Sequence, residues 1–170
     1  KDIKPHNLIF EPKVRQLKLT DFSIASRLSK EHPILSSPNL LEGTLLYVSP
    51  EQTGRMNRTV DYRTDFYSLG VTLYELLTVQ LPFQSSDPME LVHCHIAKSP
   101  VPPHYLNAQI PPQVSAVILK LMAKTAEERY QSAYGIQRDL EECLSQWQRS
   151  GSIALFPLAE RDQCGTFSIP

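Results

Sequence analysis

The chain has 170 residues, 41% of them hydrophobic, which is enough for one domain with a buried core and excludes a wholly disordered protein. Its 17 basic and 18 acidic residues leave a formal net charge of −1, so no broad positive field favours nucleic acid or an anionic membrane as a partner. The longest apolar-rich stretch, residues 66–77, is too short to span a bilayer and contains Glu75, so we expect no transmembrane helix.

The cysteines and the first residues bear on the compartment. Cys94, Cys143 and Cys164 are an odd number at wide spacings, which matches neither a disulfide framework nor a zinc site. The N-terminal residues show no basic stretch followed by a small-residue cleavage site, so no secretory signal is visible. We therefore expect a cytoplasmic protein.

Two short strands are the first elements that the sequence predicts. Residues 8–10 and 17–20 are rich in β-forming side chains and flank a polar turn, so they predict a small hairpin. Residues 21–51 have no periodicity, and Ser, Pro, Asn and Gly dominate residues 29–43. A segment of about 30 residues without regular structure is typical of a functional loop.

Two helices follow this loop. The first, near residues 65–77, is expected to be buried on all sides because apolar side chains cover nearly its whole circumference. These side chains are Phe66, Leu69, Val71, Leu73, Leu76 and Leu77. The second helix has an N-cap candidate at Ser86 or Asp87 and is expected to be amphipathic. Its apolar face contains Met89, Val92 and Ile96.

Two further helices are predicted after a proline-rich connection. The first has strong helical periodicity at Val114, Val117, Ile118, Leu121 and Met122. Ser132 can cap the second. The inward stripe of this last helix is Ile136, Leu140, Cys143, Leu144 and Trp147. After residue 150 the helical pattern stops, and the apolar residues there predict an extended linker that docks on some other surface, which the sequence does not identify; a loose tail is the alternative.

Four polar side chains near the start of the chain supply the chemistry of phosphoryl transfer to a hydroxyl. That reaction needs a carboxylate for the hydroxyl proton, a cation for the phosphate charge and oxygen ligands for magnesium. Asp2, Lys4 and Asn7 provide these within one short loop, and the predicted hairpin brings the chain back at Asp21, a second carboxylate. Taken singly, each is more simply a solvated ion pair or a turn residue.

Together these residues resemble the catalytic loop, H-R-D-L-x-x-x-N, and the D-F-G motif of the protein kinase family. Residues 43–52, GTLLYVSPEQ, are similar to the end of a kinase activation segment, with residues 49–51 at the A-P-E position. Residues 62–83 resemble the buried helix that follows that segment. The resemblance extends from residue 1 to about residue 147, and its four motifs occur in the family's order.

The resemblance implies an α+β protein-kinase-like fold, of which this chain has the C-terminal lobe only. Such a lobe is mainly α-helical, with a small β-hairpin next to the catalytic loop. Residues 1–149 would form the lobe, and residues 150–170 an extended linker toward a downstream domain. A lysine two positions after Asp2, followed by Pro5, resembles the serine/threonine class rather than the tyrosine class.

The resemblance also implies roles for individual residues, with ATP and Mg²⁺ as cofactors. Asp2 would be the catalytic base and Lys4 would lie at the transferring phosphate. Asn7 and Asp21 would bind magnesium. The remaining counterparts are Thr44, which would position the base and the substrate, and three structural residues, Glu51, Asp65 and Arg129. Among these, the arginine is expected to pair with the glutamate, and the aspartate to brace the backbone of the catalytic loop.

Three departures from the family pattern have consequences. Lys1 stands where the family usually has arginine, so it lacks the bidentate fork, and phosphorylation at Ser36, Ser37 or Thr44 is expected to be a weaker switch. Ser23 replaces the motif glycine, which costs about 1 kcal/mol if a positive φ is needed there. No G-x-G occurs, so this chain has no phosphate-covering loop.

Two functions are consistent with these observations. The first is a serine/threonine protein kinase in signal transduction, whose isolated lobe is inactive because the N-terminal lobe is missing. The second is a lone, non-catalytic lobe that acts as a protein-interaction module through its exposed apolar surface. Residues 50–70 and 156–170 are similar to large multidomain signalling kinases, chiefly bacterial. The expected partners are therefore a protein substrate, ATP, the missing N-terminal lobe and a downstream ATPase or sensor domain.

Overall fold

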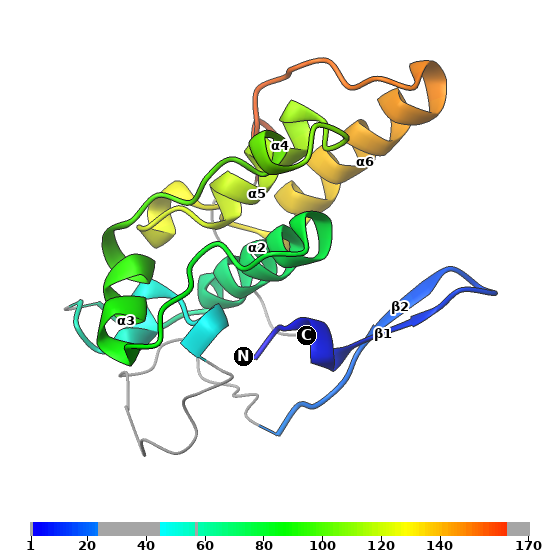
Figure 1. Cartoon of the computed structure of the whole chain (residues 1–170). Helices are drawn as coiled ribbons and strands as arrows, with labels where there is room; N and C mark the ends of the chain where they lie inside the picture. The colour runs from blue at the N-terminus through cyan, green and yellow to red at the C-terminus, as the bar shows by residue number, and fades with distance from the viewer. Residues whose placement is uncertain (1, 24–44, 57, 163–170) are drawn as a thin grey trace.

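Helix α2, Arg63–Thr78, is the element around which the other helices are arranged (Figure 1). The computed structural model describes residues 2–23, 45–56 and 58–162. The other α-helices are α3 (Pro88–Ala97), the single-turn α4 (Pro103–Leu106), α5 (Pro112–Leu121) and α6 (Ala133–Ser150). The short 3-10 helices are η1 (Pro5–Asn7), η3 (Leu45–Tyr47), η4 (Pro50–Thr53) and η5 (Ala126–Glu128).

The helices form one body with α2 against α5, α5 against α6, and α3 beside η3 and η4. Gly70 allows the close approach of α2 to α5, because a Cβ atom at this position would lie 2.8 Å from Leu121 Cβ and 2.8 Å from Met122 Cγ. The buried apolar residues form two clusters. One cluster includes Tyr67, Val71 and Tyr74 of α2. The other consists of Val117, Leu121, Tyr130 and Ile136.

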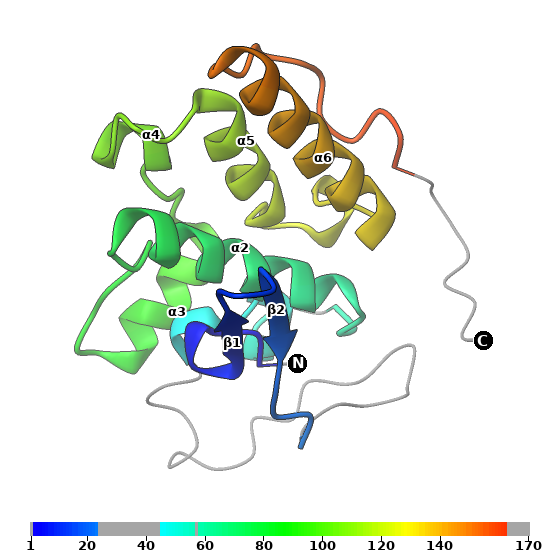
Figure 2. The same ribbon diagram turned by 90° about the vertical axis from the view of Figure 1, so that its right-hand side faces the viewer.

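The predicted hairpin is confirmed. Strands β1 (Leu8–Glu11) and β2 (Gln16–Leu19) pair antiparallel, with Leu8 opposite Leu19 and Phe10 opposite Leu17. The hairpin projects from the helical body, and in Figure 2 it lies in front of α2. Both strands are largely exposed, including the apolar side chains Ile9, Phe10 and Leu17. The mainly helical lobe with a small hairpin that the resemblance implies is therefore the observed architecture.

The helix predicted from the periodicity of residues 114–122 is confirmed as α5, whereas the predicted burial of α2 is partly wrong. Val117, Ile118 and Leu121 in α5 are at most 1% exposed. The expectation that α2 is buried on all sides fails in its last turn, where Leu76 and Leu77 are exposed.

Helices α3 and α6 show the same kind of difference. Asp87 caps α3 by accepting a hydrogen bond from Met89 N at 2.8 Å, but the Met89 side chain is exposed and Leu91 is buried instead. In α6 the predicted cap is confirmed, since Ser132 Oγ accepts from the backbone N–H of Gly135 at 3.0 Å. Of the five residues predicted to face inward, Ile136 and Cys143 are buried. The other three, Leu140, Leu144 and Trp147, are exposed.

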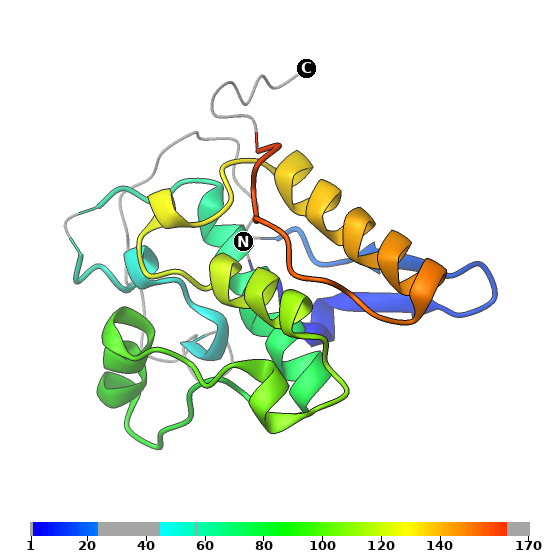
Figure 3. The ribbon, with the colours of Figure 1, turned by 90° about the horizontal axis from the view of Figure 1, so that it is seen from above.

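The segment after α6 is docked on the helices, as its apolar residues predict. It returns along α6 toward the N-terminal end of that helix (Figure 3). Leu158 and Ala159 pack against the core cluster of α5 and α6. Within the described ranges, no helix is long and apolar enough to cross a membrane.

Candidate active site

The loop before the hairpin brings three of the candidate residues into contact. Lys4 Nζ lies 2.7 Å from Asp2 Oδ2, and both side chains are mostly buried. Asn7 Nδ2 donates to the backbone carbonyl of Asp2 at 2.9 Å and to Asp2 Oδ2 at 3.1 Å. Asp2 Oδ1 is buried and has no hydrogen-bond partner among the described residues. The carboxylate is thus held by one oxygen and leaves the other without a donor.

Local backbone features explain this arrangement. Pro5 begins η1, where its fixed φ suits the first helical position, and Asn7 N donates to Lys4 O at 2.9 Å to close the turn. Asp2 has a φ of 74°, a left-handed conformation that aspartate tolerates better than most residues. The amide of Asn7 is then buried beneath the loop and bonds back to Asp2.

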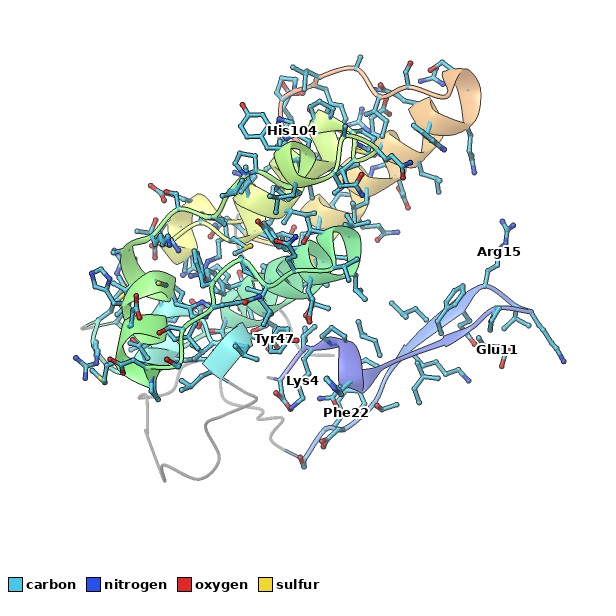
Figure 4. All side chains as sticks on the ribbon, in the orientation of Figure 1. Lys4, Glu11, Arg15, Phe22, Tyr47 and His104 are labelled. Atoms are coloured by element: carbon cyan, nitrogen blue, oxygen red, sulfur yellow. The ribbon has the colours of Figure 1, made fainter. Side chains whose placement is uncertain are left out.

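The hairpin connects this loop to Asp21. Thr20 N donates to Asn7 O at 2.8 Å, and Thr20 Oγ1 lies 3.2 Å from the same oxygen, so the chain returns directly beside Asn7. Figure 4 shows Lys4 and Phe22 at the end of the hairpin near the helical body, whereas Arg15 lies at its far end. The return of the chain beside the loop, expected from the sequence, is therefore observed.

Asp21 is exposed and is held by Ser23. Asp21 Oδ1 accepts from the Ser23 hydroxyl at 2.6 Å and from the Ser23 backbone N–H at 3.2 Å. These two hydrogen bonds lower the pKa of the Asp21 carboxyl, and the charge of Lys4 acts in the same direction. Asp21 is therefore an ionised carboxylate at neutral pH.

Helix α2 supports the loop through a residue that the sequence did not single out. Thr72 Oγ1 lies 3.1 Å from the backbone carbonyl of Ile3 and 2.8 Å from that of Ser68, and the Thr72 side chain is fully buried. Asp65 lies in the first turn of α2, seven residues before Thr72 and so on the same face. The only sequence signal for Thr72 is this spacing. The bracing role of Asp65 stays a prediction.

Glu51 and Arg129 form a buried, two-pronged ion pair. Arg129 Nη1 lies 2.7 Å from Glu51 Oε1, and Nη2 lies 2.8 Å from Oε2. Thr64 Oγ1 also donates to Glu51 Oε1, at 2.8 Å. Burial acts to raise the pKa of Glu51, but the hydrogen bonds and charge of Arg129 outweigh it and hold the pKa below its usual value. This is the pairing that the resemblance implies, and it joins η4 to the segment before α6.

Tyr47 fixes the described part of the long loop to α2, and the sequence did not single it out either. Its hydroxyl donates to Glu75 Oε2 at 2.5 Å, and its carbonyl accepts from Ser68 Oγ at 2.9 Å. Burial and the neighbouring Glu75 carboxylate raise the pKa of Tyr47 well above its usual value. Thr44 lies outside the described residues, as do Lys1 and the candidate phosphorylation positions Ser36 and Ser37.

The donor set fits a magnesium ion. Mg²⁺ prefers oxygen ligands and is commonly held by one or two carboxylates together with substrate phosphates. Asn7 uses its amide nitrogen on Asp2, so its amide oxygen remains available, and Asp21 uses only Oδ1 on Ser23. The loop and the end of the hairpin can therefore offer hard oxygen ligands from two directions.

Comparisons with known proteins point to one family. The family model for the protein kinase domain matches residues 1–143. The serine/threonine-protein kinase PknB of Mycolicibacterium smegmatis is 39% identical over 140 residues, covering 82% of this chain and 22% of that protein. The hybrid signal transduction histidine kinase G of Dictyostelium discoideum is 49% identical over 116 residues, covering 68% of this chain and 3% of that protein. The chain thus spans a small part of the length of these relatives.

Proposed function

Because the chain belongs to the protein kinase family, we propose that it carries the catalytic loop of a serine/threonine kinase that transfers the γ-phosphoryl group of ATP to hydroxyls of a protein substrate. The observation that carries the proposal is the Asp2 carboxylate. One oxygen is held by Lys4 and Asn7, and the other is buried without a donor. A substrate hydroxyl would supply that donor.

Each candidate residue has a role in this proposal. Asp2 orients the attacking hydroxyl and accepts its proton, since a carboxylate held in place is suited to general-base work. Lys4, which is paired with Asp2, stabilises the negative charge of the phosphoryl group in the transition state of its transfer. Asn7 and Asp21 would hold Mg²⁺. When bound, Mg²⁺ supplies charge neutralisation of the β- and γ-phosphates. Thr44 is proposed to position the base and the substrate.

The support for these groups is proposed to come from three other contacts. Thr72 holds the backbone of the catalytic loop at Ile3, and we assign Asp65 a bracing role on the same face of α2. The Glu51–Arg129 pair anchors the end of the loop that precedes α2. None of these groups reacts; they keep the base and the metal ligands in place.

We propose that residues 1–149 form the C-terminal lobe of the kinase domain and that residues 150–170 lead toward a downstream ATPase-like or sensor domain. The support is the helical architecture up to Ser150, together with the much greater length of the relatives. The complete enzyme would also use an N-terminal lobe that contacts ATP. A cytoplasmic location and a role in signal transduction are proposed with it, from the cysteine pattern and the family.

A second function is favoured by a specific observation. The hairpin exposes Phe10 and Leu17, and α6 exposes Leu144 and Trp147, so the lobe has apolar surface that is suited to a protein partner. On this reading the lobe is an interaction module without catalysis. It would bind Mg²⁺ and ATP poorly as an isolated chain.

Transfer of labelled phosphate from ATP, measured with the full protein that contains this chain, tests the proposal. Asp2→Asn is expected to lower kcat by about 10²- to 10⁴-fold, because the general base is lost while the shape of the side chain is kept. Glu11→Gln, the same chemical change on the exposed hairpin, should leave the rate unchanged. A rate in Asp2→Asn equal to that of the Glu11 variant would contradict the role assigned to Asp2, whereas no phosphate transfer by the unaltered full protein would favour the interaction module.

A further inference from the structure

The segment that follows α6 is bound by side chains of the two helices that it crosses. The backbone N–H of Ala154 donates to Gln146 Oε1 at 2.8 Å. Both backbone groups of Phe156 bond to one side chain: Gln113 Nε2 donates to Phe156 O at 2.8 Å, and Phe156 N donates to Gln113 Oε1 at 3.4 Å. Gln113 therefore pairs with the segment much as a neighbouring strand would.

The next contact along the segment uses a buried aspartate. Asp139 Oδ2 accepts from the backbone N–H of Ala159 at 2.8 Å and from the Tyr130 hydroxyl at 2.6 Å. Leu158 and Ala159 pack there against the core cluster. A turn closed by Asp162 N and Ala159 O, 3.0 Å apart, then directs the Asp162 side chain toward the start of α6.

Asp162 is seated at the N-terminus of α6. Its Oδ2 accepts from the backbone N–H of Gln131 at 2.5 Å, and its Oδ1 accepts from Ser132 Oγ at 2.5 Å. Gly135 leaves room for the carboxylate, because a Cβ atom there would lie 2.5 Å from Asp162 Oδ1. A negative charge at this end of an 18-residue helix is also favoured by the helix dipole.

Two buried polar side chains of α5 and α6 would lose hydrogen-bond partners if the segment left this surface. Gln113 is 2% exposed, and both of its side-chain hydrogen bonds are made to Phe156. Asp139 is buried as well and would lose the donor at Ala159. Buried polar groups without partners are strongly unfavourable, so these helix side chains favour a bound, extended chain.

The segment itself is recognised mainly through its backbone. Leu155 is 76% exposed, and Ala154 and Glu160 are exposed too, so few of its side chains contribute to the contact. Recognition by main-chain hydrogen bonds with a few side-chain positions is typical of docked extended peptides. The side chains that do make contacts are the apolar pair Leu158 and Ala159 and the carboxylate of Asp162.

We propose that the surface formed by α5, α6 and the residues that lead into α6 is a peptide-docking site. Residues 151–162 of the same chain occupy this site and bind as a single unit. Gln146, Gln113 and Asp139 bind its backbone, and the N-terminus of α6 binds the side-chain carboxylate of Asp162. Docking anchors the chain beside Gln131, two residues from the Arg129 that pairs with Glu51. The continuation of the chain thereby starts from a fixed point on the lobe.

Amide hydrogen exchange on the full chain tests this proposal. The amides of Ala154, Phe156 and Ala159 are expected to exchange at least about 100-fold more slowly than in a free peptide of residues 151–162. Asp162→Ala and Gln113→Ala remove contacts at different places. Because the segment binds as one ligand, each variant should accelerate all three amides by about 10-fold or more, with protection in α2 unchanged.

Glu160→Ala is the matched control, since Glu160 is exposed within the same segment. It should leave all three rates unchanged. Free-peptide exchange rates in the unaltered chain would overturn the proposal, and so would variants that each accelerate only their own contact. Protection that falls on dilution would place the segment of a second copy in the site and overturn occupancy in cis, whereas protection independent of concentration supports it.

Discussion

The Glu51–Arg129 pair shows what a single residue contributes to this fold. Both side chains are almost fully buried, and Arg129 also donates to the carbonyls of Ala123 and Arg63, at 2.9 and 3.0 Å. The pair therefore joins η4, the start of α2 and the segment before α6. A buried ion pair adds little compared with well-packed apolar residues, but the loss of one partner is costly because the other charge remains buried.

Glu51→Gln is expected to lower the free energy of unfolding by about 3–5 kcal/mol, because the Arg129 charge stays buried without its counter-ion. Urea denaturation of the chain at pH 7 measures this loss. Glu127→Gln is the matched control: Glu127 pairs with Arg58 on the surface, so the same change should cost about 1 kcal/mol or less. Equal losses in the two variants would contradict the role assigned to Glu51.

The stabilisation that the Glu51–Arg129 pair provides is expected to fall in acid. The pKa of Glu51 is lowered in the folded state, so its contribution to stability is complete above the usual carboxyl pKa of 4.5 and is lost as the pH falls through the lowered value. The difference in stability between the unaltered chain and Glu51→Gln should therefore be constant near neutral pH and shrink in acid. A difference that grew on acidification would show that the pKa of Glu51 is raised instead.

Ser23 shows how a departure from a motif is accommodated. The sequence predicts strain at Ser23 if this position needs a positive φ. The positive φ is found instead at Asp21, at 58°, and Ser23 is not among the residues with positive φ. Ser23 uses its hydroxyl and backbone N–H to hold the Asp21 carboxylate. The serine thus supplies hydrogen bonds that a glycine would not supply in full.

At the scale of elements, the contact between α2 and α5 depends on a missing side chain. Gly70→Ala is expected to destabilise the chain by about 1–3 kcal/mol, because the new methyl group would overlap Leu121 and Met122 in a packed core. This outweighs the better helix propensity of alanine, which is about 1 kcal/mol. The thermal midpoint measures the effect.

Ser145→Ala, at an exposed position of α6, is the control for this change and should leave the midpoint nearly unchanged. A higher midpoint for Gly70→Ala than for the unaltered chain would mean that α2 and α5 are not packed as closely as the structure has them. Thr72 lies two residues after Gly70 in α2, on nearly the opposite side of the helix, and bonds to the catalytic loop. Close packing and support of the site therefore depend on one helix.

Across the described part of the molecule, two apolar surfaces are candidates for contact with another protein. One is the projecting hairpin. The other is a groove of about 460 Å³ between the end of α2, the connection before α5, and α6. Its apolar lining includes Leu77, Ile110, Val114, Leu144, Trp147 and Ile153. Apolar surface of this kind is typical of a face that meets another protein surface.

Trp147 is the only tryptophan in the chain, so its fluorescence reports on the groove. The indole is half exposed, so we expect emission between the buried and the fully exposed limits and clear quenching by iodide, though weaker than in the urea-unfolded chain. The unfolded chain is the reference for full exposure. Short-wavelength emission protected from iodide would contradict an open groove and show that it is covered in solution.

Features that depend on residues close together in the chain could be predicted from the amino-acid sequence. The hairpin, the helix caps at Asp87 and Ser132 and the apolar stripe of α5 follow from patterns within a few positions, and the structure confirms them. Residue types and order also identified Asp2, Lys4, Asn7 and Asp21 as candidates for one chemistry. The Glu51–Arg129 pairing came from resemblance to a family, because no local pattern links residues 78 positions apart.

Which apolar faces are covered, and which distant residues meet, depends on how the helices pack together. Ile136 and Cys143 are buried whereas Leu140, Leu144 and Trp147 on the same predicted stripe are exposed, because the packing of neighbouring elements decides which part of the stripe is covered. Thr72 touches the catalytic loop 69 residues away, and Asp162 reaches the start of α6 by way of a turn. Such contacts arise from the packing of whole helices, which short-range periodicity does not encode.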